Sequence, residues 1–155
     1  WVISKKPTAV GVATGAVAGL VAITPAAGST GVEGALVIGA ISSLVCYFGA
    51  TKIKHMLGYD DSLDVFGVHG IGGIVGALLT GVFIREGYDG PAGGFTQFWI
   101  QAKSVIITIA WSGTAAMIAL VTAKLLCRGI RVDEDIEHGG LDRSEHSEEA
   151  YNWEA

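Results

Sequence analysis

A single histidine stands in an apolar, glycine-rich stretch of this chain, the segment DVFGVHGIGGIVGALLTG that contains His69. On an α-helix, the side chains three and four positions away lie beside such a ring. Two of these neighbours are bulky and apolar and two are glycines: Val65, Phe66, Gly72 and Gly73. Because an ionisable ring facing lipid is costly, the ring should point into protein, and the glycines leave room there for a neighbouring helix or a narrow passage; an ionisable group inside a membrane is a candidate for function. The alternative is a structural histidine that hydrogen-bonds a neighbouring helix.

Four more residues are candidates for the same site. Val65 shares the face of His69 one turn below, so it is a candidate wall of the passage. Asp64 lies at the start of this helix, where we favour an N-terminal cap over a direct cation site, since a carboxylate there accepts from free amides and faces the positive end of the helix dipole. Thr14 and Thr24 are weaker candidates, because a hydroxyl in a membrane helix commonly bonds its own backbone.

Other kinds of chemistry find no support in the sequence. The glycines of GVHGIGG lie inside an apolar run, whereas a phosphate-binding loop needs a strand-to-helix turn. Cys46 and Cys127 lie in or beside apolar runs and should fill space rather than form a disulfide. No nucleophile–base set and no metal spacing is present. We therefore expect a protein that is not an enzyme, with no cofactor, no metal and no nucleic-acid partner.

Four apolar runs must position the candidate residues. They span about 8–28, 34–51, 65–84 and 98–126, and each is long enough to cross the hydrocarbon core of a bilayer as a helix. The chain is 50% hydrophobic and 16% charged, whereas soluble domains carry about 25% charged residues. Buried helices of a large soluble protein are the less favoured alternative. The sequence predicts an all-α integral membrane protein with four transmembrane helices.

Charge sets the expected orientation. The connectors on one side of the four runs hold six basic residues: Lys5, Lys6, Lys52, Lys54, Arg128 and Arg131. The opposite loops hold one arginine between them, and basic residues favour the cytoplasmic side. Both ends of the chain should therefore be cytoplasmic. Residues 1–132 form the membrane region, and residues 133–155, with nine acidic residues and one arginine, form an acidic cytoplasmic tail.

The first run should pack closely against another helix. Gly11, Gly15 and Gly19 are spaced by four residues, with Ala18 and Ala22 nearby, a small-residue pattern that lets helix backbones approach in a membrane. Pro25 should end or kink this helix.

The segment DDSLDVFGVHGIGGIVGALLTGVF closely resembles the histidine-bearing helix of ammonium transporters, the Amt/Mep/Rh family. The segments KPTAVGVATGAVAGLVAITPAAG and TIAWSG, and GIRV, GLD and EEAYN in the tail, resemble the same family in the same order. The tail favours the Amt branch over the Rhesus branch. The resemblance covers essentially the whole chain.

The resemblance implies an eleven-helix fold, of which this chain supplies the last four helices and the tail. It implies a homotrimer in the cell membrane, with one pore for ammonium or ammonia through each subunit. His69 matches the second of two pore histidines, and its partner belongs to a helix upstream of this chain. His55 cannot be that partner, because it lies in a cytoplasmic connector. In relatives the tail packs under neighbouring subunits, and PII-type signal proteins block the inner pore mouth.

Two alternatives remain open at this point. The chain opens on Trp1 and soon enters an apolar run, so we expect an N-terminally truncated fragment, with processing as the alternative. The function is then that of a channel-like ammonium transporter, of which this is the C-terminal part. The alternative function is a non-conducting membrane assembly or an ammonium-sensing fragment.

Overall fold

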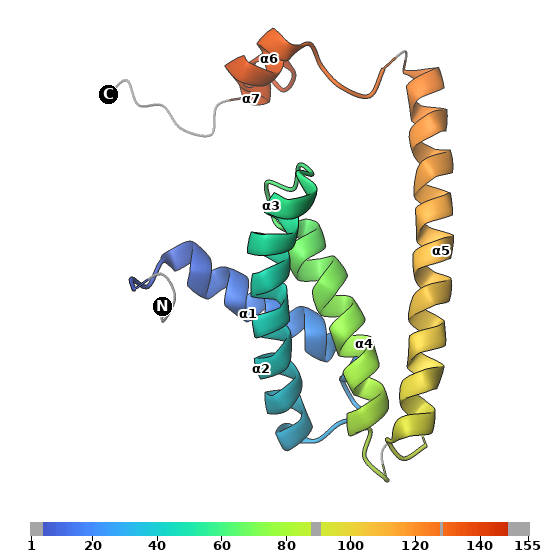
Figure 1. Ribbon diagram of the computed structural model, residues 1–155. Helices are drawn as coiled ribbons and strands as arrows, with labels where there is room; N and C mark the ends of the chain where they lie inside the picture. The colour runs from blue at the N-terminus through green and yellow to red at the C-terminus, as the bar shows by residue number, and fades with distance from the viewer. Residues whose placement is uncertain (1–4, 88–90, 128, 149–155) are drawn as a thin grey trace. The chain divides into compact units, whose positions relative to one another are not determined.

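The computed structural model of the chain describes residues 5–87, 91–127 and 129–148. These residues form helices and turns with no β-strand, as Figure 1 shows. Four helices are long and apolar enough to cross a membrane: Ala9–Ala26, Val32–Leu57, Val65–Phe83 and Phe95–Leu126. The predicted all-α fold with four candidate transmembrane helices is therefore confirmed. The chain divides into two compact units, Trp1–Ile109 and Ala110–Ala155.

The first helix, α1 (Ala9–Ile23), begins and ends at residues whose chemistry explains both limits. Thr8 is its N-cap, and the Thr8 hydroxyl oxygen accepts a hydrogen bond from the Gly11 amide at 3.0 Å. Pro25 has no amide hydrogen to donate, so the α-helix stops at Ile23 and a short 3-10 helix, η1 (Thr24–Ala26), follows. The predicted effect of Pro25 on this helix is confirmed.

The second span is one helical rod built from three segments. It runs through α2 (Val32–Phe48), a π-helical turn, η2 (Gly49–Ile53), and α3 (Lys54–Leu57). Gly58 follows with φ 62°, a left-handed conformation that suits glycine and ends the rod. The connector to the third span is therefore short, and it leads directly to the histidine segment.

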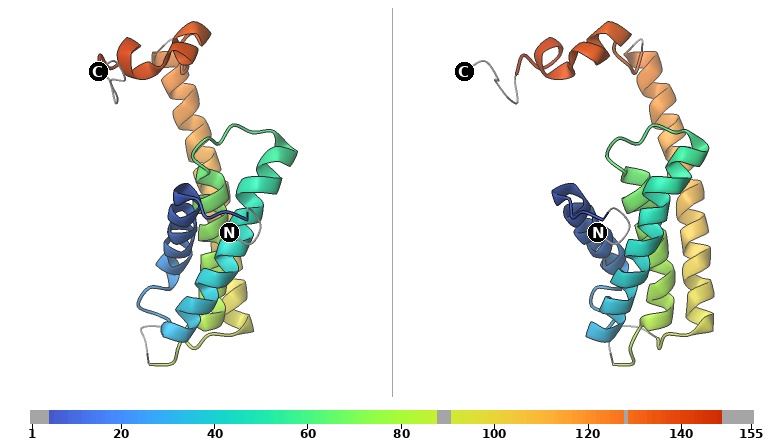
Figure 2. Two further views of the ribbon diagram at one scale, coloured as in Figure 1. Left: turned by 90° about the vertical axis from the view of Figure 1, so that its left-hand side faces the viewer. Right: turned by 60° about the vertical axis from the view of Figure 1, so that its left-hand side comes forward.

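The third span begins with a second π-helical turn. This turn, η3 (Val65–Gly70), carries His69 and continues as α4 (Ile71–Phe83). π-helical turns are rare and occur frequently at functional sites. In the views of Figures 1 and 2, α1, α2 and α4 lie side by side.

The core of the first unit lies between these three helices. One cluster joins Ala18, Cys46 and Val68, with Ile71 packed against it. A second cluster of buried residues with partly buried neighbours has six members: Ala22, Ala26, Ile38, Ile23, Leu79 and Phe83. The small side chains of Ala18, Ala22, Ala26 and Cys46 among these positions let the helices approach closely, which is how apolar helices associate in a membrane.

The close approach occurs at glycines of α4. A Cβ atom on Gly76 would overlap the carbonyl of Ala22 in α1. A Cβ atom on Gly72 would lie 3.2 Å from the Cys46 sulfur in α2 and 3.3 Å from Val21. Both neighbouring helices thus pack on one face of α4.

The glycines of α1 do not make the close contact that their spacing predicted. A Cβ atom on Gly15 or on Gly19 would meet nothing within 4 Å among the described residues. One on Gly11 would meet only the hydroxyl of Thr8, its own cap. The buried side of α1 is instead marked by Ala18 and Ala22. The close packing predicted for this helix is therefore made at Ala18 and Ala22, whereas Gly15 and Gly19 make no helix contact within the described residues.

The fourth span, α5 (Phe95–Leu126), is a regular α-helix that begins a few residues before the predicted limit. A Cβ atom on Gly81 would lie 2.8 Å from the Phe98 amide nitrogen, so the end of α4 closely contacts the start of α5. The described span Phe95–Leu126 has no buried residue, and Trp111 is 75% exposed.

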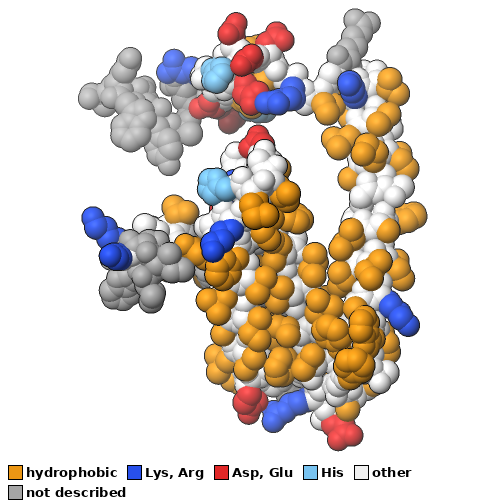
Figure 3. Space-filling model, in the orientation of Figure 1, with side chains coloured by type: hydrophobic (Ala, Val, Ile, Leu, Met, Phe, Trp, Pro, Cys, Tyr) orange, Lys and Arg blue, Asp and Glu red, His pale blue; other side chains and the backbone are white. Residues whose placement is uncertain are grey.

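Apolar side chains also cover the outer faces of the helix bundle. In Figure 3, hydrophobic side chains extend along α2 and α4, and charged side chains gather near the helix ends. Leu36 and Leu44 on α2 are 71% and 64% exposed. Apolar surface on this scale suits contact with lipid or with further helices rather than with water.

The second unit contains two short helices after α5, namely α6 (Glu134–Gly139) and α7 (Leu141–Ser144). Arg131 donates to both carboxylate oxygens of Glu137 at 2.7 Å. This ion pair joins the GIRV segment to the first helix of the tail. Arg128, one of the six basic connector residues, lies outside the described residues.

Candidate functional site

His69 lies on an open face of its helix. Its side chain is exposed, and a Cβ atom on Gly73, four residues later, would meet nothing within 4 Å among the described residues. Gly72 and Gly76 face the other way, toward α2 and α1. The glycines near the histidine therefore have two functions, since one set packs helices and Gly73 leaves space beside the ring.

The backbone that carries His69 is a π turn rather than the α-helix assumed from the sequence. The Ile71 amide donates to the Phe66 carbonyl, five residues back. A π turn holds more residues than an α turn, so the side chains around His69 are not spaced as in the α-helix assumed from the sequence. Val65 is 54% exposed, and its predicted function as a passage wall stays a prediction.

Phe66 packs beside the histidine turn. A Cβ atom on Gly70 would lie 3.0 Å from the Phe66 ring, and the Tyr59 ring meets Phe66 edge-on at 5.6 Å between centroids. The absence of a side chain at Gly70 therefore leaves room for the Phe66 ring.

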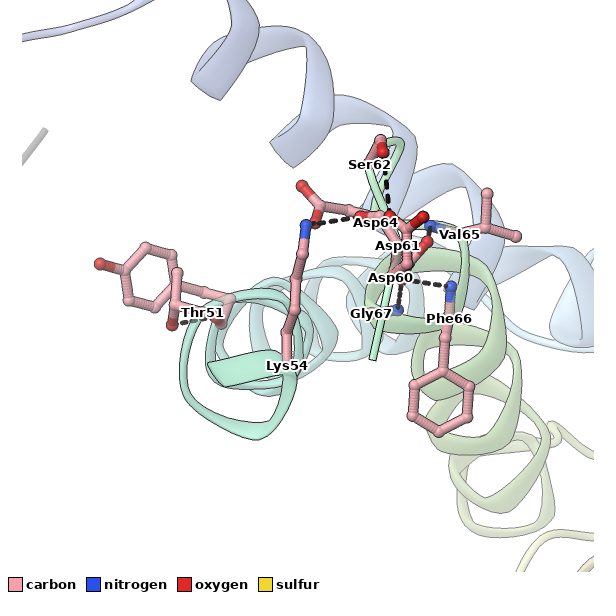
Figure 4. A network of polar contacts seen from close by, with 10 residues as sticks. Thr51, Lys54, Asp60, Asp61, Ser62, Asp64, Val65, Phe66 and Gly67 are labelled. Carbon is pink, nitrogen blue, oxygen red and sulfur yellow. Dashed lines mark hydrogen bonds and ion pairs between the residues drawn. The ribbon is translucent and has the colours of Figure 1, made fainter. Parts of the chain in front are cut away.

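Asp61 caps the start of the histidine turn. Its carboxylate accepts hydrogen bonds from the amides of Val65 at 2.7 Å, Phe66 at 2.9 Å and Gly67 at 3.4 Å (Figure 4). These amides are the first of the helix and have no carbonyl partner within it. Asp61 was not among the residues predicted from the sequence, although the acidic and hydroxyl residues of DDSLD before an apolar run are a recognised start signal.

Asp64 does not make the cap that we favoured for it. It occupies the N-cap position, but its backbone is left-handed, with φ 52° and ψ 35°, and its side chain makes no capping hydrogen bond. The carboxylate instead pairs with the Lys54 ammonium at 2.9 Å, and Lys54 also donates to the Asp61 carbonyl (Figure 4). The left-handed backbone turns the Asp64 side chain away from the helix amides, which explains the exchange of functions with Asp61.

Of the two threonines, Thr24 makes the local bond expected of it. Its hydroxyl donates to the Leu20 carbonyl at 2.7 Å, within its own helix. Thr14 is half-buried and lines a pocket of about 310 Å³ between α1, α2 and η3. Asp64 and Val68 line the same pocket. The structure thus brings Thr14 and Asp64 together, whereas His69, Val65 and Thr24 do not line this pocket.

A buried thiol contacts the histidine turn from α2. Cys46 is 2% exposed, and its Sγ lies 3.7 Å from the Val68 carbonyl and 3.5 Å from the Ser42 hydroxyl. Cys46 fills the core as predicted, whereas Cys127 is exposed, and both thiols are free. Sequence could not indicate the bond to Val68, because it joins residues of different helices.

In the described part of the chain, no group of three or more His, Cys, Asp or Glu side chains is placed to hold a metal ion.

Residues 1–151 match the family described as Ammonium Transporter Family, which is a family of transporters rather than enzymes. An ammonium transporter of Aquifex aeolicus is 47% identical over 98% of this chain and 36% of the relative. One of Bacillus subtilis is 40% identical over 97% of this chain and 39% of the relative. The crystal structure of Saccharomyces cerevisiae Mep2 is 33% identical, with a TM-score of 0.75 over 84% of this chain and 31% of that one. The chain thus spans little more than a third of the length of these curated relatives.

Proposed function

Since the chain belongs to the ammonium transporter family and is a multi-pass membrane protein, we propose that it is the C-terminal part of a channel-like ammonium transporter. His69 is one of a pair of pore histidines, and its partner comes from a helix outside this chain. Thr14, Thr24, Val65 and Asp64 are secondary candidates along the same route. The C-terminus is cytoplasmic, the assembly is a homotrimer, and a PII-type signal protein acts at the cytoplasmic face.

The observation that carries this proposal is the open face at His69. In the described chain the ring is exposed and Gly73 has free space beside it. A histidine in a membrane helix must face protein or a water-accessible passage, because contact with lipid is unfavourable. Helices outside this chain would cover the face, and Gly73 would leave room for a small solute beside the ring.

Elementary chemistry explains why a histidine suits this solute. Ammonium is a strongly hydrated cation, and an apolar passage cannot replace its hydration, so the intact ion meets a high barrier. Potassium meets the same barrier but has no proton to lose. Ammonium can deprotonate and cross as neutral ammonia. A neutral imidazole has one donor and one acceptor nitrogen, so it can hydrogen-bond ammonia or pass on its proton.

The test compares two histidines of the full-length protein at matched membrane levels. His69→Asn keeps a side chain that can hydrogen-bond but does not titrate near neutral pH. We expect it to abolish ammonium flux or to admit potassium. His55→Asn is the control, since His55 is exposed on α3 outside the proposed pore. Wild-type ammonium flux with potassium still excluded in His69→Asn would return His69 to a structural function.

A second arm of the same test uses this chain alone in liposomes. We expect no ammonium-dependent pH change, because α5 has no buried residue in the described chain and the open face of His69 is uncovered. A clear signal that His69→Ala removes would contradict the proposal that further helices are needed. If the full-length protein carries no ammonium, the alternative of a non-conducting assembly or sensor is favoured.

A further inference from the structure

The direction of the His69 side chain depends on the π turn that carries it. The five-residue bond from the Ile71 amide to the Phe66 carbonyl gives η3 more residues per turn than an α-helix. If the turn relaxed to α-helical bonds, the residues at its start would rotate relative to α4. His69 lies between the two residues that this bond joins, so the register of the turn affects which way His69 faces relative to Gly72 and Gly76, the residues that pack on α1 and α2.

One carboxylate holds the start of the turn. Asp61 accepts from three successive amides, those of Val65, Phe66 and Gly67, through its two oxygens. Oδ2 takes two of these bonds, to Phe66 at 2.9 Å and to Gly67 at 3.4 Å. Bonds from a charged acceptor to backbone amides are stronger than neutral ones, so this cap fixes the first three residues together.

The second span packs against the middle of the turn. A Cβ atom on Gly67 would lie 2.8 Å from the Cα atom of Ala50, so the backbones touch where η2 and η3 meet. Cys46 Sγ lies 3.7 Å from the carbonyl of Val68, the residue before His69. The two residues that precede the histidine are thus held between the Asp61 cap and the second span.

We propose that Asp61 is a positioning residue for His69, because its carboxylate fixes the π-helical register of Val65–Gly70 and with it the direction of the ring. Asp61 acts only through the backbone amides that it caps. This inference rests on the proposed function, since it concerns the ring that would line the pore.

The test needs a variant that removes the cap and a neighbour that matches it in charge. Asp61→Asn is isosteric, but its amide nitrogen cannot accept, so one of the two capping oxygens is lost. Asp60→Asn is the control, since it removes the same charge one residue earlier. The Asp60 carboxylate accepts from the Ser62 hydroxyl at 3.2 Å and makes no hydrogen bond to η3 within the described residues.

The first measurement is the concentration dependence of ammonium flux through the full-length protein at matched membrane levels. A ring moved by about 1 Å can lower a rate roughly a hundredfold. We therefore expect Asp61→Asn to lower the maximal flux at least about tenfold, with little change in the half-saturating concentration. Asp60→Asn should match wild type. A cap that served only folding would lower the amount of protein and leave the flux per molecule unchanged, which would overturn the inference.

The second measurement is amide hydrogen exchange, which does not depend on transport. Asp61→Asn should speed exchange in Val65–Gly70 while Asp60→Asn leaves it unchanged, and unchanged exchange in Asp61→Asn would also overturn the inference. The outcomes separate the two proposals. No ammonium flux through wild type rejects the proposed function and this inference together, whereas wild-type flux that Asp61→Asn leaves intact rejects the inference alone.

Discussion

The span from Val65 to Phe83 contains a π turn, a carboxylate cap and buried glycines, whereas the described span α5 from Phe95 to Leu126 is regular α-helix with no buried residue. Both are apolar enough to cross a membrane. The backbone of the span Val65–Phe83 is held by contacts with other helices of this chain. The backbone of α5 is held mainly by its own hydrogen bonds. Within the described residues, the span that carries His69 is therefore the one held by contacts with other helices of this chain, and most of α5 makes no such contact.

The two spans should differ most in how a glycine-to-alanine substitution, which adds one methyl group, changes the free energy of unfolding. Gly76→Ala should lower the free energy of unfolding by about 2–3 kcal/mol, because its Cβ would overlap the Ala22 carbonyl. In α5, Gly113→Ala should raise it by up to about 1 kcal/mol, since alanine favours helix and a Cβ there meets nothing within 4 Å among the described residues. Reversible unfolding of the chain in detergent micelles measures both. A change of the same sign at the two sites would remove the distinction.

Replacement of the two cysteines by alanine should give a smaller difference in the free energy of unfolding. Cys46→Ala should cost about 1–2 kcal/mol, because it leaves a small cavity and removes the bond from the thiol to the Val68 carbonyl. Cys127→Ala, just after α5, should change stability by less than about 0.5 kcal/mol, since this thiol is exposed. The same unfolding measurement applies. Equal losses would mean that Cys46 does not contribute to the core as described.

Replacement of two lysines by methionine should give the smallest difference in stability. Lys54→Met removes the ion pair between the partly exposed side chains of Lys54 and Asp64, so it should lower stability only slightly. Lys124→Met, in the last turn of α5, should have almost no effect, since Lys124 makes no ion pair with any described residue. The measurement is the denaturant midpoint of each variant at low and high salt. A loss in Lys54→Met that salt leaves unchanged would point to packing of the lysine stem rather than to the ion pair.

The four spans could be predicted from the sequence because they depend on local composition and length. The stop of α1 before Pro25 could be predicted for the same reason, since a missing amide hydrogen is a local property. The family followed from the segments around His69, and the match over residues 1–151 confirms it.

The structure of the candidate site could be predicted only in part. The position of His69 was evident, but its neighbours were derived from α-helical spacing. The π turn depends on contacts between segments distant in sequence, such as Gly67 against Ala50, which no local pattern contains. The exchange of functions between Asp61 and Asp64 depends on the left-handed backbone of Asp64, a conformation uncommon for residues other than glycine.

The length of α5 has a consequence for its place in a bilayer. Its 32 residues extend about 48 Å, whereas a hydrocarbon core is about 30 Å thick. The uncharged stretch Ser104–Ala123, between Lys103 and Lys124, extends about 30 Å and matches that thickness without tilt. The two ammonium groups would then stand at opposite headgroup layers, with long stems reaching outward. The same helix would continue beyond both layers, joining the lipid-embedded part of the protein to its water-exposed ends without a break.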